Sequence, residues 1–152
     1  MLEEIDRHIL EELQRNGRIS NVELARRINL SPPAALARTK RLEEEGYIRD
    51  YTAILDRDQV GFDMLCFVSI SLQMHQYSEV ERFRGKIEEM PEVLECYHVT
   101  GEFDYLLKVV IQNRKDLERF VVKRLTPIPG VARIYTSMVL TELKSTTSLP
   151  LT

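Results

Sequence analysis

Residues 20–46 read SNVELARRINLSPPAALARTKRLEEEG, and this stretch decides the fold of the N-terminal part of the chain. It opens with a capping box. Ser20 can accept a hydrogen bond from the backbone N–H of Glu23, and the Glu23 side chain can in turn accept one from the backbone N–H of Ser20. Asn29 tolerates the left-handed backbone of a tight turn, and Ser31 can cap the segment that follows. The pattern predicts two helices joined by a short turn.

The sequence on either side completes a three-helix arrangement. Ile5, Ile9 and Leu13 recur every four residues and predict an earlier amphipathic helix. Pro32 fits the first position of the last helix, and Gly46 is suited to end it. Three helices with short connections describe a helix-turn-helix. We therefore predict a helix-turn-helix domain over residues 1–55, winged-helix-like if residues 47–55 form a short strand, followed by a linker over residues 56–61.

After the linker the hydrophobic period changes from helical to alternating. Val68, Ile70, Leu72 and Met74 alternate with polar residues, which predicts a half-buried strand. The later pattern adds a helix over 78–90, strands over 93–100 and 103–111, a helix over 115–125 and a strand over 131–143. The order β-α-β-β-α-β is the ferredoxin-like arrangement, with both helices on one face of an antiparallel sheet. The fold class is thus α+β, with a ferredoxin-like sandwich over residues 62–152.

The uncovered face of this sheet is expected to carry apolar side chains. Leu65 and Phe67 contribute to it from the first strand, and Leu106 and Val110 from the third. Because an exposed face that is partly apolar marks a subunit interface, we predict a homodimer formed through this domain.

Composition places the chain among ordinary soluble proteins, with 43% hydrophobic and 30% charged residues in a length of 152. The N-terminus lacks the pattern of a signal peptide, and the longest apolar run, Met64 to Val68, is too short to cross a membrane. A cytoplasmic protein that does not bind membranes is expected.

The formal net charge of −3 hides a local basic excess. The segment from Arg15 to Arg41 contains seven basic residues and one acidic residue, Glu23. Such a stripe can attract the phosphates of nucleic acid, although a solvated charged face is the more common meaning of a charge run taken alone.

A helix-turn-helix with a basic flank points to double-stranded DNA, because the major groove accepts an α-helix. Arg38 and Arg41 offer several hydrogen-bond donors each, whereas the alanines and prolines beside them carry little base-specific information. Loose base recognition, helped by DNA bending and by several domains acting together, is expected. The alternative is a helical subdomain with no DNA partner. The candidate DNA-binding residues are Arg18, Ser31, Pro33, Ala34, Ala37, Arg38, Lys40 and Arg41.

The turn between the second and third strands is a candidate ligand site. Its glycine, Gly101, allows a ligand to approach the backbone, and Asp104 can pair with an amino group. On the residue pattern alone, a plain hairpin turn is the favoured interpretation. The candidate effector-binding residues are Tyr97, Gly101, Glu102, Phe103, Asp104, Thr136 and Ser137.

Catalysis has little support in the sequence. The histidines His8, His75 and His98 form no metal-ligand spacing with cysteine or carboxylate, and no nucleophile or phosphate-binding motif is present. Cys66 and Cys96 lie in apolar runs and are expected to be buried free thiols. We expect no enzyme, no metal and no cofactor.

Six segments of the sequence together match the pattern of a known family: Asp6–Leu10, Asn16–Ser20, Glu23–Ala25, Asn29–Pro32, Arg41–Ile48 and Thr100–Tyr105. In combination they resemble the Lrp/AsnC family, the feast/famine regulators of bacteria and archaea, over nearly the whole chain. The resemblance implies a transcriptional regulator of amino-acid metabolism, with a winged or plain helix-turn-helix and an αβ sandwich. It also implies dimers that assemble into an octamer, and an amino-acid effector, with leucine or methionine favoured, bound between dimers near residues 101–105.

One departure from the family pattern and two alternatives stand beside this interpretation. Where relatives often carry further polar or basic residues early in the third helix, this chain has Pro33-Ala34-Ala35, so a relative's operator sequence should not be transferred. Some relatives of this architecture are sirohaem decarboxylases, which makes an enzyme one alternative. The other is an architectural protein that wraps DNA without an effector.

Overall fold

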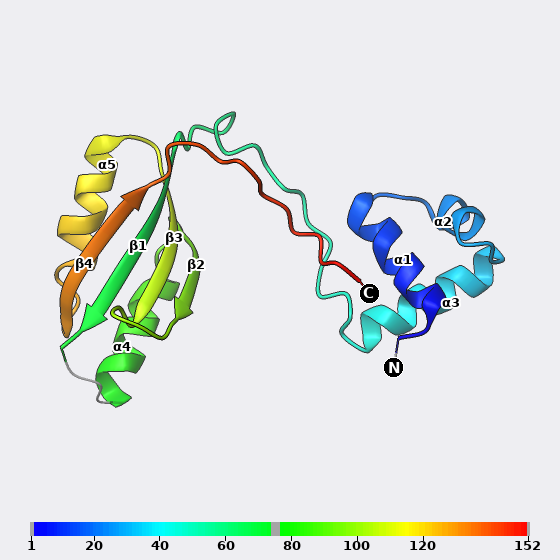
Figure 1. The fold of residues 1–152 in the computed structure, drawn as a ribbon, viewed down its shortest axis with the longest axis horizontal. Coiled ribbons are helices and arrows are strands. Elements are labelled where there is room, and N and C mark those ends of the chain that lie inside the picture. Colours follow the sequence, from blue (N-terminus) through cyan, green and yellow to red (C-terminus); the bar gives the residue numbers. More distant parts are fainter. Residues whose placement is uncertain (1, 74–76, 152) are drawn as a thin grey trace. The chain divides into compact units, whose positions relative to one another are not determined.

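The computed structural model describes residues 2–73 and 77–151, so the predicted strand residue Met74 and the candidate His75 lie outside the described residues. The chain forms two compact units. One contains residues up to Ile54 together with the segment from Lys144 onward, and the other contains Leu55 to Leu143 (Figure 1). The division after residue 54 lies close to the boundary expected from the sequence. The segment from Lys144 onward, which the sequence analysis included in the second domain, groups with the first unit.

The first unit consists of helices α1 (Glu4–Arg15), α2 (Asn21–Arg27) and α3 (Pro32–Glu44). Ser20 caps α2 as predicted, since its hydroxyl accepts a hydrogen bond from the Glu23 N–H at 3.2 Å. The Glu23 side chain does not complete the predicted capping box, because it accepts hydrogen bonds from Arg26 and Arg27 instead. The core of this unit contains the apolar residues of all three helices, namely Ile9, Leu10, Leu24, Ala25, Ile28, Ala35 and Leu42.

Both ends of α3 are fixed by local hydrogen bonds. Ser31 accepts from the Ala34 N–H, and Asn29 has the left-handed backbone (φ 58°) expected of it. At the other end Gly46 has φ 78°, and the N–H groups of Gly46 and Tyr47 donate to the carbonyls of Glu43 and Leu42. This pair of bonds is a Schellman motif, so the predicted helix end at Gly46 is confirmed.

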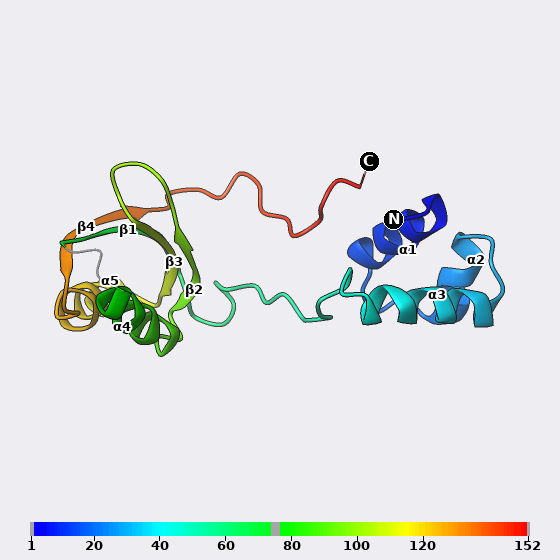
Figure 2. The same cartoon turned by 90° about the horizontal axis from the view of Figure 1, so that it is seen from below.

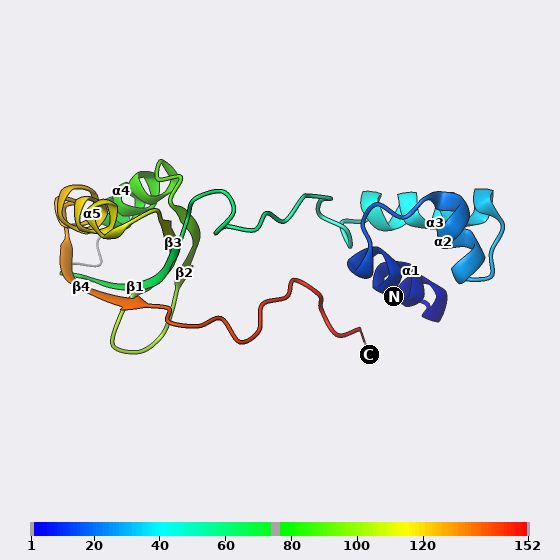
Figure 3. The ribbon, with the colours of Figure 1, turned by 90° about the horizontal axis from the view of Figure 1, so that it is seen from above.

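The second unit is the predicted ferredoxin-like sandwich. Its sheet has the order β2-β3-β1-β4, and every neighbouring pair is antiparallel. Helices α4 and α5 both cover one face, and the loop between β2 and β3 projects on the other side (Figures 2 and 3). The elements are β1 (Met64–Leu72), α4 (Tyr77–Glu88), β2 (Val93–His98), β3 (Tyr105–Ile111), α5 (Arg114–Arg119), the π-helix η1 (Phe120–Leu125) and β4 (Val131–Met138).

The strand register decides which side chains face the helices. Val68 on β1 lies opposite Leu107 on β3 and Thr136 on β4, and the first two belong to the core beneath the helices. The next residues along each strand therefore point to the open face, among them Ser69, Leu106 and Tyr135. Two of the predicted open-face residues, Leu65 and Val110, are already buried within one chain.

Several local predictions were wrong. Residues 47–55 form no strand, and Tyr51 instead donates a hydrogen bond from its hydroxyl to Glu43. The strands predicted to end at residues 100 and 143 end at His98 and Met138. The predicted helix 115–125 begins one residue earlier and continues as the π-helix. Cys66 is buried as expected, but Cys96 is exposed because it lies on the edge strand β2.

The C-terminal segment packs on α1. The Gln14 side chain forms two hydrogen bonds to the backbone of Leu149, with lengths of 2.6 and 3.1 Å. Leu151 packs against the hydrophobic core of the first unit. The Gln14 amide thus pairs with both backbone groups of Leu149, as a neighbouring strand would. The tail is therefore held at Leu149 by hydrogen bonds and at Leu151 by apolar packing.

We expect Leu151→Ser to destabilise the first unit by about 1 kcal/mol, because it removes a partly buried apolar side chain from the edge of the core. Leu149→Ala is the matched control, since the Leu149 side chain is 70% exposed and only its backbone binds Gln14. Urea unfolding followed by circular dichroism measures both variants. Equal midpoints for the two variants would show that the tail packing contributes no stability.

Candidate DNA-binding and effector-binding sites

Helix α3 is positioned by α2 and presents one face to solvent. The Asn21 side chain at the start of α2 donates to the carbonyl of Pro32 at 2.8 Å, which couples the beginnings of the two helices. Ala35 and Leu42 point into the core. The exposed residues on the opposite side lie three or four positions apart and so form one face. This face consists of Pro33, Leu36, Ala37 and Lys40, and we call it the α3 outer face.

The two arginines of α3 bind a buried carboxylate. Asp6 on α1 has no exposed surface, and its two oxygens accept hydrogen bonds from Arg38 at 2.9 Å and Arg41 at 2.6 Å. Arg38 also contacts Glu3 at 2.9 Å. Burial by itself raises the pKa of Asp6, but the hydrogen bonds from Arg38, the Glu3 backbone and Arg41 outweigh it and hold this pKa below its ordinary value. These arginines therefore join α3 to α1, and each stays partly exposed.

Much of the basic stripe is neutralised within the domain. Glu12 on α1 pairs with Arg15 and Arg27, and Glu23 pairs with Arg26 and Arg27. Hydrogen bonds from these arginines lower the pKa of Glu23 to about 2. Counting charges along the sequence missed these pairs because the carboxylates come from the acidic flank and from α2 itself.

Two predicted DNA-binding residues carry unpaired positive charge. Arg18, in the turn after α1, and Lys40 are exposed and make no ion pair within the residues that the structure describes. Of the other predictions, Pro33 and Ala37 lie on the α3 outer face, Ala34 is half-buried, and Ser31 uses its hydroxyl as the helix cap. The sequence analysis missed Leu36, which is 56% exposed. The helical spacing from Pro33 to Lys40 was the signal for it.

The turn between β2 and β3 is held by backbone hydrogen bonds. Gly101 has φ 114°, a conformation that favours glycine. The Asp104 carboxylate accepts a hydrogen bond from the Leu72 N–H at 2.8 Å, and the Asp104 N–H donates to the carbonyl of Ile70. Asp104 thus attaches the turn to the end of β1, which is a structural role that its sequence position did not indicate.

Side chains of β4 brace the same turn. Arg133 pairs with Glu102 at 3.0 Å and lies over the ring of Phe103, 5.1 Å from its centre. The Tyr135 ring lies 6.2 Å from Phe103. Sequence reasoning missed Arg133 and Tyr135, although the alternation of β4 places Arg133, Tyr135 and Ser137 on one face. Together these groups form a polar and aromatic surface beside Gly101.

The structure does not bring the remaining predicted effector residues together within one chain. Thr136 points to the helix-covered face, while Ser137 and Tyr97 belong to the open face. Tyr97 lies on β2 and Ser137 on β4, which are the two edges of the sheet. Strands lie about 4.8 Å apart, so these two side chains are on the order of 14 Å from each other.

The described part of the chain contains neither a candidate metal site nor a candidate membrane-spanning helix. No group of three histidine, cysteine, aspartate or glutamate residues there is arranged to hold a metal ion. Among residues 2–73 and 77–151, no helix combines the length and the apolar character needed to cross a bilayer. His8 and His98 belong to different units, and His98 stacks on Tyr105 with 5.0 Å between ring centres.

Two protein-family models match different parts of the chain. Residues 2–49 match a winged helix-turn-helix DNA-binding model, and residues 65–149 match the Lrp/AsnC ligand-binding domain. A helix-turn-helix DNA-binding domain together with a ligand-binding domain defines a class of transcriptional regulators.

Similar proteins identify the family. The Leucine-responsive regulatory proteins of Salmonella typhimurium and Escherichia coli are 40% identical over 97% of this chain and 90% of their own length. A transcriptional regulator from Neisseria meningitidis, solved as its L-Met complex, has a TM-score of 0.96 and 39% identity, covering 99% of this chain and 97% of its own. Escherichia coli AsnC has a TM-score of 0.90, with 27% identity and 99% of both chains covered. The chain belongs to the Lrp/AsnC family of transcriptional regulators.

Proposed function

We propose that this regulator controls genes of amino-acid metabolism and binds DNA through the α3 outer face in response to an amino acid, with leucine or methionine favoured. The observation that carries the DNA part is the α3 outer face itself. It is a capped helix side with exposed apolar groups and the unpaired Lys40, in a domain of the DNA-binding type. With chromosomal DNA as its partner, the protein acts in the cytoplasm.

The residue types on this face define the mode of DNA binding. Lys40 and Arg18 contact phosphates, and the exposed part of Arg38 and Arg41 adds to the same field. Leu36 and Ala37 are suited to thymine methyl groups, which gives weak base discrimination. Sequence preference then comes from DNA shape and from several domains of one assembly bound at once.

The effector part rests on the surface beside Gly101. The similar Neisseria meningitidis regulator was solved with L-Met, and the relatives named above are leucine-responsive by name. Arg133 is suited to the effector carboxylate and the rings of Phe103 and Tyr135 to an apolar side chain. We place the effector between dimers of a homo-octamer, with Tyr97 or Ser137 of a neighbouring copy completing the site. A ligand there acts by favouring one assembly over another.

The test uses a duplex selected from a random-sequence library and labelled for fluorescence anisotropy. We expect Lys40→Ala to weaken binding and to reduce the slope of log affinity against log salt by about 1 for each domain bound to the duplex, because one Lys–phosphate interaction is removed from each domain. Lys123→Ala, an exposed lysine on η1, is the control and should leave the slope unchanged. A Lys40→Ala protein with wild-type affinity and slope would contradict the assignment of α3.

The effector half of the proposal has its own readout. The duplex affinity is measured with and without each of the twenty amino acids, and light scattering reports the assembly size under the same conditions. A change in either quantity with leucine or methionine is expected. DNA binding that ignores all twenty, with no change in assembly, would favour an architectural protein.

A further inference from the structure

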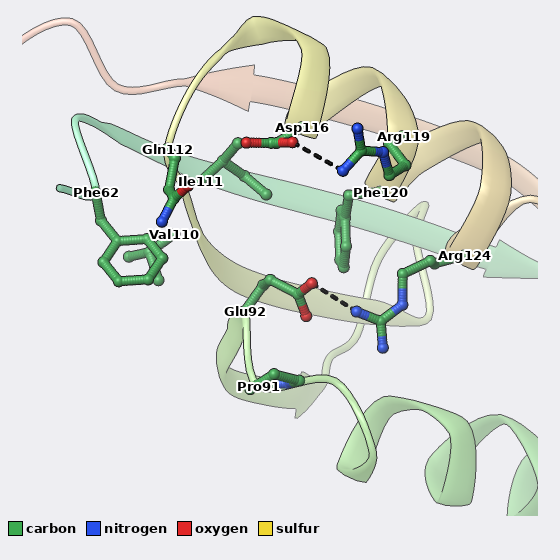
Figure 4. Close-up of a pocket in the computed structure, with 10 residues that line it drawn as sticks. All are labelled: Phe62, Pro91, Glu92, Val110, Ile111, Gln112, Asp116, Arg119, Phe120 and Arg124. Atoms are coloured by element: carbon green, nitrogen blue, oxygen red, sulfur yellow. Dashed lines mark hydrogen bonds and ion pairs between the residues drawn. The ribbon is translucent and has the colours of Figure 1, made fainter.

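The second unit contains a cavity far from the Gly101 turn. Its volume is about 340 Å³, and it lies where β3 ends, between the start of β2 and the α5–η1 segment (Figure 4). The turn precedes the first residue of β3, Tyr105, whereas the cavity lies at its last residue, Ile111. At about 3.4 Å per residue, the two places are roughly 20 Å apart along the strand. The cavity is therefore a separate place from the effector surface.

One wall of this cavity is apolar and aromatic. Phe62, which comes just before β1, and Phe120 of η1 both line it, and Pro91 closes one side (Figure 4). Phe120 is only 2% exposed, so its ring is a fixed part of the wall. A volume of this size and lining suits the side chain of a small apolar molecule.

Charged groups of both signs lie on either side of Phe120 (Figure 4). Arg124 donates to Oε1 of Glu92, and Arg119 pairs with Asp116 at 3.2 Å (Figure 4). The other oxygen of Glu92, Oε2, is buried and has no hydrogen-bond partner among the described residues. A buried carboxylate oxygen without a donor is costly, so the Glu92 carboxylate is only partly satisfied by Arg124.

The backbone at the cavity has an unusual conformation. Residues 120–125 form a π-helix, and the N–H of Thr126 donates to the carbonyl of Val121, five residues back. π-Helical turns are rare and occur frequently at functional sites. Here Phe120 and Arg124 both belong to this segment and both line the cavity. The same irregular turn thus supplies an aromatic wall and one of the charged groups.

From these observations we infer that the cavity binds a free α-amino acid with an apolar side chain, at a second site within each chain. The ammonium group pairs with the Glu92 carboxylate, whose side chain is 29% exposed, the ligand carboxylate accepts from the exposed Arg119, and the ligand side chain packs on Phe62 and Phe120. A simple cation fits less well because Arg119 and Arg124 both line the cavity and repel it. A simple anion is repelled by Glu92. A zwitterion avoids both penalties, and the inference does not depend on DNA binding.

Isothermal titration of the full-length protein with L-methionine, L-leucine and L-phenylalanine tests this site. We expect the titration of at least one of these amino acids to show two classes of site. Glu92→Gln and Arg119→Gln should each weaken the affinity of one class at least tenfold. Glu89→Gln is the matched control, because Glu89 follows α4, is 70% exposed and pairs only with Lys86 among the described residues. Circular dichroism confirms that each variant is folded, and two glutamine variants guard against a folding defect in one of them.

The analogues of the best binder that lack the amino or the carboxyl group extend the test. Both should bind this site at least tenfold more weakly than the amino acid itself. The inference is overturned if both glutamine variants bind the amino acids as the wild-type protein does. It is also overturned if the wild-type protein binds none of the three amino acids. A Glu92→Gln chain with altered oligomeric state and unaltered amino-acid binding also overturns it, since a second copy would then fill the cavity. Loss of DNA binding in any variant concerns the proposed function and leaves this result unaffected.

Discussion

Asp6→Asn is expected to destabilise the DNA-binding unit by about 3 kcal/mol, because it breaks a buried ion pair while leaving both arginines in place. The carboxylate has no exposed surface and holds Arg38 and Arg41 at 2.9 and 2.6 Å, so it is the main polar link between α1 and α3. A loss of this size is a large part of the stability of a small domain. Urea unfolding monitored by circular dichroism measures it, and Glu4→Gln is the control on the same helix, since Glu4 is exposed.

The pH dependence follows from the direction of the pKa shift. The pKa of Asp6 is lower in the folded than in the unfolded protein, so its contribution is fully present above the unfolded value of about 3.9 and is lost as the pH falls towards the folded value. Wild type should therefore lose stability below about pH 4 more steeply than Asp6→Asn. Parallel curves for the two proteins would show that the carboxylate is not stabilised by its arginines.

This ion pair also changes how arginine variants are interpreted. Alanine at both Arg38 and Arg41 leaves the Asp6 charge buried without a partner, which costs more than the loss of a DNA contact. Weak DNA binding by such a protein reports a damaged domain as well as the removal of two basic groups. Lys40, which makes no described ion pair, is the cleaner probe of the α3 outer face.

The order of elements and the ends of the helices were predictable because they depend on short-range chemistry. Ser31 caps its own helix, Asn29 and Gly46 take left-handed backbone, and alternation along β1 and β3 indicates one buried face. Each of these signals involves residues within a few positions of one another. The ferredoxin-like order then follows from known rules of sheet topology.

The parts that sequence reasoning missed depend on contacts between distant residues. Asp6 is separated from Arg41 by 35 positions, and Gln14 from Leu149 by 135. Charge counting therefore assigned Arg38 and Arg41 wholly to DNA, and nothing near the tail in the sequence indicated its contact with α1. The face on which Thr136 lies was not predictable for a different reason, since the register of β4 against β1 decides it, and register is not visible in a single strand.

The strongest effect on DNA affinity is expected from Ala37→Glu, at the centre of the α3 outer face. Ala37 is exposed and helical, so glutamate is tolerated by the fold, but its charge meets the negative potential of the groove. We expect at least a hundredfold decrease in affinity, because every domain of one assembly carries the change and the effects multiply through avidity. Fluorescence anisotropy at fixed salt measures it, with circular dichroism to confirm folding.

His8→Glu provides the control within the same domain. His8 is an exposed residue of α1, so this variant adds the same side chain away from the α3 outer face. Its effect should be limited to a small electrostatic change that disappears at higher salt, since long-range repulsion is screened within about 10 Å at 0.1 M salt. The Ala37→Glu effect should persist there, because a glutamate inside the groove is in direct contact with the duplex. Equal decreases for the two variants at every salt concentration would mean that overall charge, and not the outer face of α3, governs DNA binding.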